Sequence, residues 1–322
     1  MKKIWIFSWA AMLAVVCACT KNDAAEPVPV IRLDLALQGY ADLDSVARQQ
    51  LIDNYRPEVD AFFSVLGYPD PQDPELEWWS RSDEVTMFQP QVDAAFPSLG
   101  AFEASLGHIV CRAKADSLPV DGMRFASVVW GKPYPVVPID SVMLIALNHY
   151  LGPEHESYAH MATWRQAEKD PKYMPYDVAS ALAASTAGEF TTKDAPTVLN
   201  NLLYEGALVE ARMRLVPDAK LADALGYTSE TLAELEAALP DIKTEMAQRR
   251  MLYDTDPDLI NRLFAGGASS PLLNGAAPGR AGRYVGYTLV HRYAEEHPKA
   301  TLRDLLSPSF YDNPATLQQI GF

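Results

Sequence analysis

Two glycines inside one helical stretch constrain this chain more than any other feature. The segment 278–293 opens with Pro278-Gly279, a turn signal, and then continues with helical periodicity. One stripe of that helix carries Gly282, Gly286, Val290 and Tyr293. An interior glycine costs a helix about 1 kcal/mol relative to alanine. Close approach of a neighbouring backbone would offset this cost, so we predict a buried, tightly packed helix. Structural roles are assigned to Gly279, Gly282 and Gly286.

A second stripe of the same helix carries polar groups on aromatic rings. Tyr284, Tyr287 and His291 lie on it, and Arg280 stands at the start of the helix. We expect their polar tips to project from an aromatic face, where Arg280, Tyr284 and Tyr287 could rim a cleft. The alternative is that these three side chains only brace the glycine helix.

Residues 1–18 have the pattern of an export signal. Lys2 and Lys3 precede an apolar run over 4–16, and small residues follow it. The apolar run is too short for a stable membrane span. We therefore expect residues 1–18 to be a lipoprotein signal peptide.

The tetrad 16–19, Val-Cys-Ala-Cys, resembles a lipobox. We expect Cys19 to become the acylated N-terminus, carrying chains such as palmitate, because several acyl chains are needed for stable attachment. The polar, proline-containing stretch 19–29 would be the tether. Acylation of Cys17 and an ordinary cleaved signal are the alternatives.

The charge of the chain disfavours two classes of partner. The formal net charge is −15, and removal of residues 1–18 deletes two lysines and no acids, which gives −17. Such a charge disfavours nucleic acid and anionic lipid surfaces. We expect membrane contact through the lipid alone.

The pattern of elements predicts a single α+β domain over 30–322, mostly helical with a small central sheet. It divides into a helical portion at about 30–118, the sheet at about 123–148 and a second helical portion at about 157–322. Strands are expected at Val30–Leu35, Met123–Trp130 and Ile139–Leu147, and a rigid loop at the prolines of 69–74. Helices are expected at 43–66 with an interruption at Pro57, 83–96, 101–115, 157–169, 176–189, 197–214, 229–252 with a break at Pro240, 256–264, 280–297 and 302–306.

Three segments together resemble a known family. They are the strand at 31–34, the run 147–152 (Leu-Asn-His-Tyr-Leu-Gly) and the helix 278–293. Their order resembles the GldB family of gliding-motility-associated lipoproteins of Bacteroidota, over most of the mature chain. The resemblance implies a lipid-anchored protein of the cell envelope, at the outer membrane, with envelope or motility proteins as partners. It supplies no reaction.

The order of elements is also similar, more distantly, to zincin-like metallopeptidases of the predicted membrane-associated type. That resemblance places the zinc helix at Tyr176–Ser185 and a metal ligand at Glu205. The helix contains no histidine, and none occurs between Met161 and Val290. The resemblance therefore implies a degenerate scaffold, a pseudo-peptidase without a zinc-bound nucleophile. We expect no metal, no cofactor and no enzymatic activity.

His155 and His160 do not restore a zinc motif. They are five residues apart, so at about 100° per residue the second imidazole is turned by about 140° from the first. A zinc helix needs a spacing of four, which places both imidazoles on one face. We interpret this segment as a solvated transition from loop to helix.

Three further side chains are candidates for a cleft or an interaction site. His149 and Tyr150 stand where a strand ends, a place where ligand-facing residues gather, although a core histidine is the alternative. Glu205 lies among leucines on a helix, so either its carboxylate pairs with a cation or its pKa is raised. Arg280 is a possible partner, either in a bracing ion pair or in a pocket.

The sequence thus favours a non-enzymatic envelope lipoprotein that acts through protein–protein interaction. Trp78 and Trp79, after an acidic proline-rich loop, could anchor a partner, with at least one of them buried in the core. One alternative is a hydrolase with an unrecognised site around His149, Glu205 and Tyr287. Another is a tethered protein that binds a ligand in a degenerate cleft.

Overall fold

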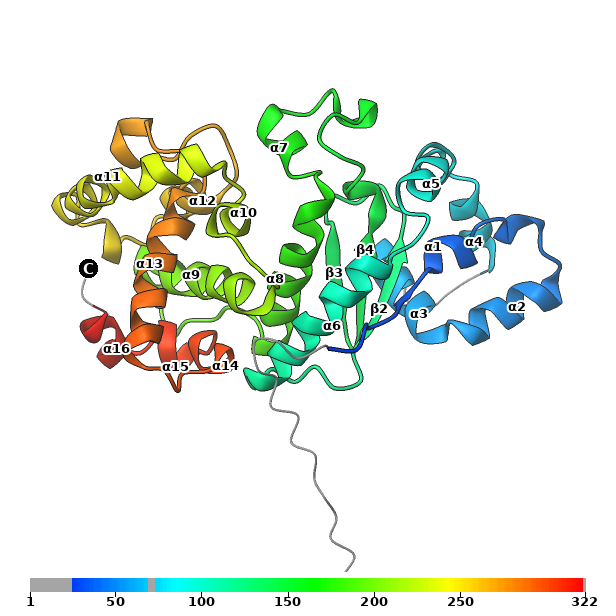
Figure 1. Cartoon of the computed structure of the whole chain (residues 1–322), viewed down its shortest axis with the longest axis horizontal. Helices are drawn as coiled ribbons and strands as arrows, with labels where there is room; N and C mark the ends of the chain where they lie inside the picture. The colour runs from blue at the N-terminus through cyan, green and yellow to red at the C-terminus, as the bar shows by residue number, and fades with distance from the viewer. Residues whose placement is uncertain (1–24, 69–72, 321–322) are drawn as a thin grey trace, which may run out of the picture.

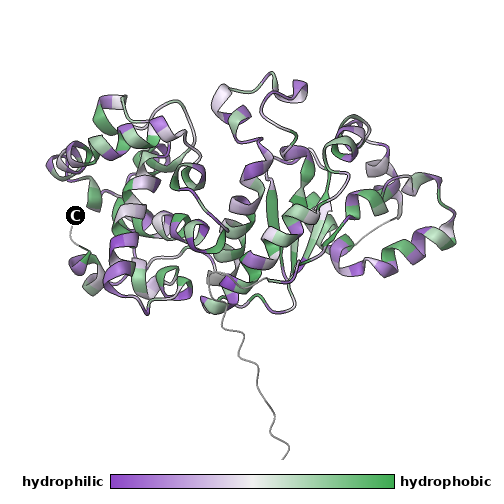
Figure 2. Cartoon of the chain, viewed as in Figure 1, coloured by the Kyte–Doolittle hydropathy of each residue, from purple (hydrophilic) through white to green (hydrophobic). Residues whose placement is uncertain are grey.

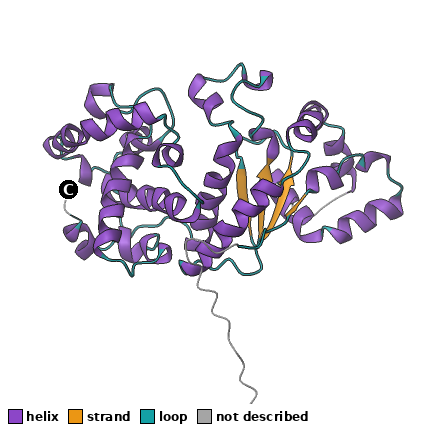
Figure 3. Ribbon diagram, in the orientation of Figure 1, coloured by secondary structure: helices purple, strands orange, loops and turns teal. Residues whose placement is uncertain are grey.

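The computed structural model describes residues 25–68 and 73–320, which form an α+β fold of many helices around one small sheet (Figures 1 and 3). Cys19, the expected signal peptide and most of the expected tether lie outside the described residues. The strands are β1 (Val30–Ile31), β2 (Arg124–Val128), β3 (Val136–Ile139) and β4 (Val142–Ala146). The helices are α1 (Leu33–Ala36), α2 (Ser45–Asn54), α3 (Arg56–Leu66), α4 (Asp73–Ser80), α5 (Asp83–Ala95), α6 (Gly100–Ala115), α7 (Thr163–Ala167), α8 (Met174–Ala187), α9 (Val198–Leu215), α10 (Leu221–Leu225), α11 (Ser229–Gln248), α12 (Pro257–Phe264), α13 (Ala281–Glu296), α14 (Leu302–Leu305), α15 (Pro308–Tyr311) and α16 (Pro314–Gln319).

The sheet is mixed and has the strand order β1-β2-β4-β3. Strands β1, β2 and β4 run parallel, with Phe125 of β2 opposite both Val30 and Met143. Strand β3 pairs antiparallel with β4. Every residue of β4 is buried, as expected of a strand covered on both faces. The strands are the most uniformly hydrophobic part of the ribbon in Figure 2.

Helices flank the sheet on both sides (Figure 1). The helices α2 to α5 gather at one end, with α3 packed against β4, while α8 contacts the edge strand β3. The bundle built around α9 and α13 lies at the other end, and α8 joins it to the sheet by contacting α9. The molecule therefore consists of a sheet half and a helical half that meet along α8.

Helices α9 and α13 pack through glycines. A Cβ placed on Gly286 would lie 2.9 Å from the carbonyl carbon of Leu202 and 3.2 Å from the amide nitrogen of Gly206. A Cβ on Gly206 would in turn lie 2.8 Å from the amide nitrogen of Tyr287. Since these neighbours are backbone atoms, no side chain could move to make room. The glycine stripe predicted close approach of a neighbouring backbone, and the structure shows this approach between α13 and α9.

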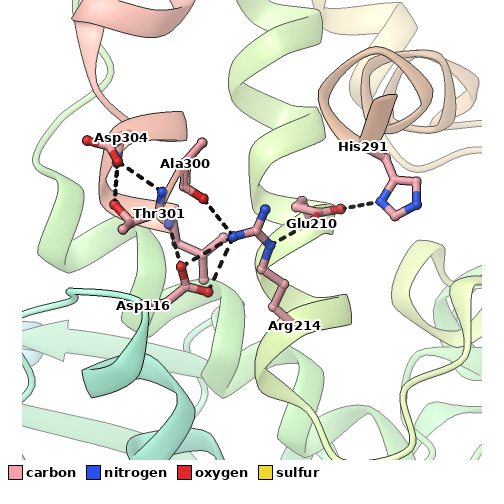
Figure 4. Close-up of polar contacts among 8 residues, drawn as sticks. Asp116, Glu210, Arg214, His291, Ala300, Thr301 and Asp304 are labelled. Atoms are coloured by element: carbon pink, nitrogen blue, oxygen red, sulfur yellow. Dashed lines mark hydrogen bonds and ion pairs between the residues drawn. The ribbon is translucent and has the colours of Figure 1, made fainter. Parts of the chain in front are cut away.

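An ion-pair network around Arg214 ties the two halves together (Figure 4). Arg214 on α9 donates from Nε to Glu210 at 2.8 Å and from Nη1 to Asp116, at the end of α6, at 3.2 Å. The same Nη1 bonds the carbonyl oxygen of Ala300 at 3.1 Å. Glu210 also accepts from His291 on α13 at 3.0 Å. One guanidinium therefore links α6, α9 and the C-terminal segments.

The strand expected at Val30–Leu35 is shorter than predicted. Only Val30–Ile31 pairs with β2, and the chain then turns into α1. Asp34 is buried there and accepts hydrogen bonds from Arg32, Gln89 and Ser127. Burial alone would raise the pKa of Asp34, but these bonds and the charge of Arg32 bring it below the ordinary value.

The strand expected at Ile139–Leu147 is present as β4, which spans Val142–Ala146, but the strand before it was missed. That strand, β3, ends at Ile139 and forms a hairpin with β4, and Asp140 adopts a positive φ of 50° in the turn. The valines before Pro138 were not recognised as a strand because prolines interrupt the apolar pattern. Pro138 is tolerated because β3 is the edge strand in the described part of the sheet.

Two helix predictions and one loop prediction also needed correction. The segment 157–169 is mostly loop, with a short 3₁₀ turn at Glu156–Tyr158 and only α7 helical. Part of the predicted rigid proline loop belongs to α4, since proline fits the first turn of a helix. Helix α11 continues through Pro240 without a break. Pro240 is exposed, so water can satisfy the carbonyl that loses its hydrogen bond.

Among the helices of the described residues, none has the length and apolar character required to cross a membrane.

Candidate functional site

A polar cavity of about 200 Å³ lies where the sheet half meets the helical half. It is lined by the loop before β3, His149, the residues after α7, the start of α8 and the arginines of α9 and α13. We call it the central cavity. Its cationic side chains are Lys169, Arg212, Arg280 and Arg283, and its acidic ones are Glu168, Asp177 and Asp223.

His149 lines the central cavity as a neutral, fixed imidazole. Its Nε2 lies 2.9 Å from the carbonyl oxygen of Lys132, and its Nδ1 lies 3.0 Å from Nζ of Lys169. Because a carbonyl only accepts and an ammonium only donates, Nε2 carries the hydrogen and Nδ1 accepts. Burial, and then the positive charge of Lys169, lower the pKa of His149 to about 4. Both ring nitrogens are thus engaged, which leaves no free nitrogen for a general base.

Tyr150 lies behind the cavity wall. Its hydroxyl donates to Oδ2 of Asp177 at 2.8 Å, and burial raises its pKa well above the ordinary value. Asp177 faces Arg212 at 3.8 Å, and burial raises the pKa of this carboxyl despite the guanidinium. Tyr150 therefore positions Asp177 and does not itself line the cavity.

Arg280 reaches the cavity from the first residue before α13. Its backbone adopts the left-handed region, with φ of 66°. The guanidinium forms a close ion pair with Glu168 and lies over the ring of Trp164. Two glycines leave the space for it, because a Cβ on Gly226 would lie 2.7 Å from its Nη1 and one on Gly266 2.8 Å from its Nη2.

Glu205 pairs with a different arginine from the one proposed. Its Oε2 lies 3.0 Å from Nε of Arg283, one turn along α13, whereas Arg280 pairs with Glu168. The side chain of Glu205 is partly exposed, so it is not the isolated buried charge that its leucine neighbours suggested. Glu205 holds a cavity-lining arginine without lining the cavity.

Tyr284 and Tyr287 do not rim the central cavity. Both rings are buried, and Tyr287 stacks on His291 with ring centroids 5.1 Å apart. Burial, and then the charge of Glu210, raise the pKa of Tyr287 to about 12. The expected cleft therefore contains His149 and Arg280, backed by Tyr150 and Glu205, while the two tyrosines of α13 pack elsewhere.

Only the first residues of the helix that the peptidase resemblance assigned to a lost metal site lie at this cavity. Tyr176 and Asp177, near the start of α8, line it, and Glu205 bonds one of its arginines. In the described part of the chain, no group of three or more His, Cys, Asp and Glu side chains is placed to hold a metal. The peptidase ancestry stays a prediction.

A second cavity, of about 360 Å³, lies where α3, α4 and the loop after β2 meet, and the carbonyl of Lys132 in that loop also bonds His149 of the central cavity. We call this second cavity the aromatic groove. Trp78 is 66% exposed beside it, whereas Trp79 is buried with 5% exposed, so one of the two tryptophans joins the core. The aromatic groove is lined by Leu66, Tyr68, Trp78, Trp79, Ser82, Glu84, Trp130, Gly131 and Lys132. Its floor is rigid, because Phe62 packs edge-on against Trp79 and stacks with Trp130.

Sequence reasoning missed most of the charged wall of the central cavity. Arg283 stands inside the glycine helix, one turn after Arg280, and this spacing of three was the available signal. Lys169 and Asp177 belong to segments whose approach to α13 depends on tertiary packing, which no local pattern encodes.

Comparison with known proteins supplies the family. Residues 19–314 match the family model described as gliding motility protein GldB. No curated protein and no solved structure was found to match the chain. Since the match covers most of the sequence, including both halves of the fold and both sites described above, this chain belongs to the GldB family of gliding-motility lipoproteins.

Proposed function

We propose that this chain is a lipid-anchored envelope protein, held at the outer membrane, that binds a protein partner of the gliding or a related envelope machinery. No chemical step is required for this role. The observation that carries the proposal is Trp78, which exposes 66% of its surface beside the aromatic groove. Tryptophan is enriched among residues that dominate binding energy at interfaces, and contiguous apolar surfaces such as Trp78 with Leu66 and Tyr68 mark interaction sites.

The groove has the anatomy of a docking site for an apolar side chain. Trp78 and Tyr68 form its exposed aromatic edges, and Trp130 and Trp79 form a floor that Phe62 holds in place. Tyr134 is also exposed, and its carbonyl oxygen accepts a hydrogen bond from Nε1 of Trp130 at 3.0 Å. A partner that inserts an aromatic or aliphatic side chain would find a preformed surface, which reduces the ordering cost of binding.

The proposal is tested by affinity purification from detergent-solubilised envelopes with the native anchor intact. Trp78→Ala is expected to lower recovery of the partner at least tenfold, and Tyr253→Ala is the matched control. Tyr253 is also strongly exposed, at 73%, but lies in the helical half. Equal recovery with both variants, or a loss with both, would count against docking at the aromatic groove.

The hydrolase alternative finds less support in the geometry. Of its three residues, His149 lines the central cavity with both nitrogens engaged, Glu205 pairs with Arg283, and Tyr287 stacks on His291. Binding of a small ligand is favoured by a specific observation, the charged wall of the central cavity.

A further inference from the structure

The arginines of the central cavity have hydrogen-bonding capacity that the protein leaves unused. The Nε atoms of Arg212 and Arg280 are buried and have no hydrogen-bond partner in the described part of the chain. Nε of Arg283 is buried as well and meets Glu205 in an ion pair without hydrogen-bond geometry. A buried donor left unpaired loses the hydrogen bonds that water gave it and gains none in return, which destabilises the fold. Two unpaired donors, and a third held only by an ion pair, surround one cavity and indicate that an acceptor belongs there.

The charges of the cavity also leave an excess. Its wall contains four cations, Lys169, Arg212, Arg280 and Arg283, and three acids, Glu168, Asp177 and Asp223. Asp223 is bonded at 2.7 Å by Lys172, which is not part of the wall. Glu205 pairs with Arg283 from behind the wall. The four cations are therefore balanced by only three acids, Glu168, Asp177 and Glu205.

The positive charges of the arginines in this wall repel one another. Burial, and then the charge of Arg283, lower the pKa of Arg280 to about 10. Asp177 offers only partial compensation, because it lies 3.8 Å from Arg212 and burial raises the pKa of its carboxyl. An added anion would relieve this repulsion.

The hydroxyl of Tyr176 supplies a further donor, and the cavity volume limits the size of the ligand. The hydroxyl of Tyr176 accepts a hydrogen bond from the amide of Lys220 at 3.0 Å, so its own hydrogen can be donated. The volume of about 200 Å³ equals that of about seven water molecules and is smaller than a pocket for a drug-sized ligand. The space suits one anionic group with few attached atoms.

We propose that the central cavity binds a small oxyanion, a carboxylate or a phosphate group, between the guanidinium groups of Arg212, Arg280 and Arg283. The planar guanidinium matches both oxyanions through paired N–H donors. This site is separate from the aromatic groove, so it goes beyond the proposed docking of a protein partner. Each of the two proposals can fail without the other.

The test is calorimetric titration of the full mature chain in detergent, with sodium phosphate and separately with sodium succinate, at constant ionic strength set by sodium chloride. Saturable binding of one equivalent of at least one probe is expected, and the probe that binds distinguishes phosphate from carboxylate. Arg280→Gln should weaken binding at least tenfold. Arg249→Gln is the matched control, because Arg249 forms an exposed ion pair with Glu245 on α11 and should leave binding unchanged.

Arg280→Lys keeps the proposal testable if Arg280→Gln fails to fold, because it retains the charge that pairs with Glu168. It removes the guanidinium fork and should weaken binding at least fivefold. Trp78→Ala should bind the probe as the parent does. Absence of saturable binding for both probes, or an unchanged dissociation constant in Arg280→Lys, would overturn the proposal.

Discussion

The neutral imidazole of His149 makes stability depend on pH in a defined window. The pKa of this side chain is about 4 in the folded protein, against about 6.5 in an unfolded chain. Between these values the unfolded state binds more protons, so the free energy of unfolding falls as pH drops from 6.5 towards 4. At pH 4.5 the loss from this group amounts to about 2–3 kcal/mol relative to pH 7.

His149→Gln is expected to remove this part of the acid sensitivity. An amide can donate to the carbonyl of Lys132 and accept from Lys169, as the imidazole does, but it does not titrate. Urea unfolding of both proteins at pH 7 and pH 4.5 measures the difference. The same loss of stability in the variant would mean that other groups, such as carboxylates, control the acid transition.

At the scale of single residues, the sequence predicted His149 and Arg280 as cavity residues because each stands at a recognisable boundary, a strand end or a helix start. For Tyr284 and Tyr287 the packing favours the alternative that they brace the glycine helix, because the stripe they share faces other helices and not the cavity. A helical stripe shows which residues share a face, but not what that face meets. Only the packing of α13 on α9 decides this.

The pair of helices α9 and α13 depends on Gly286. Gly286→Leu would force a side chain into the backbone of Leu202 and Gly206, where neither neighbour can yield. Overpacking typically costs about 1–3 kcal/mol. We expect the free energy of unfolding to fall by at least this amount, and the displaced helix to carry Arg283 out of the central cavity.

Glu296→Leu is the control for this substitution, because it adds the same side chain to the exposed end of α13. Thermal unfolding of both variants, with phosphate or succinate binding measured below the transition, checks the prediction. If Gly286→Leu were as stable as the parent protein, the glycine face would not be essential for the packing of the two helices.

The ends of helices could be predicted from the sequence where the capping residues lie close to them in the chain. Helix α9 begins after Thr197, whose side chain forms a capping box with Asn200, and α13 begins at the predicted turn. The strands were less predictable. Asp34 converts an apparent strand into a turn through bonds to Gln89 and Ser127, residues far away in the sequence. Such partners cannot be identified from a pattern of neighbours.

At the scale of the whole molecule, Arg214 couples the helical half to the sheet half. Arg214→Met would leave the buried carboxylate of Glu210 without its guanidinium and would release Asp116. Removing one partner of a buried pair costs about 3–5 kcal/mol, and the partial exposure of Arg214 reduces this to about 2–3 kcal/mol. We expect a lower unfolding midpoint in chemical denaturation.

Arg56→Met serves as the comparison, since Arg56 forms exposed ion pairs with Asp53 and Asp60 within the sheet half. Exposed pairs contribute about 0–1 kcal/mol, so this variant should unfold almost as the parent protein does. Similar losses in the two variants would show that Arg214 does not link the halves.

The proposed lipid anchor on Cys19 would determine where the whole molecule acts. Cys19→Ala is expected to abolish fatty-acid labelling and to move the protein from the membrane to the soluble fraction, because a chain without acyl groups has no other predicted attachment. Cys17→Ala is the matched control and should remain labelled and membrane-bound. Metabolic labelling with palmitate, followed by fractionation, compares the two. Persistent labelling of Cys19→Ala would assign the acylated residue to Cys17. Loss of partner recovery in a released but folded Cys19→Ala protein would show that docking at the aromatic groove requires the membrane.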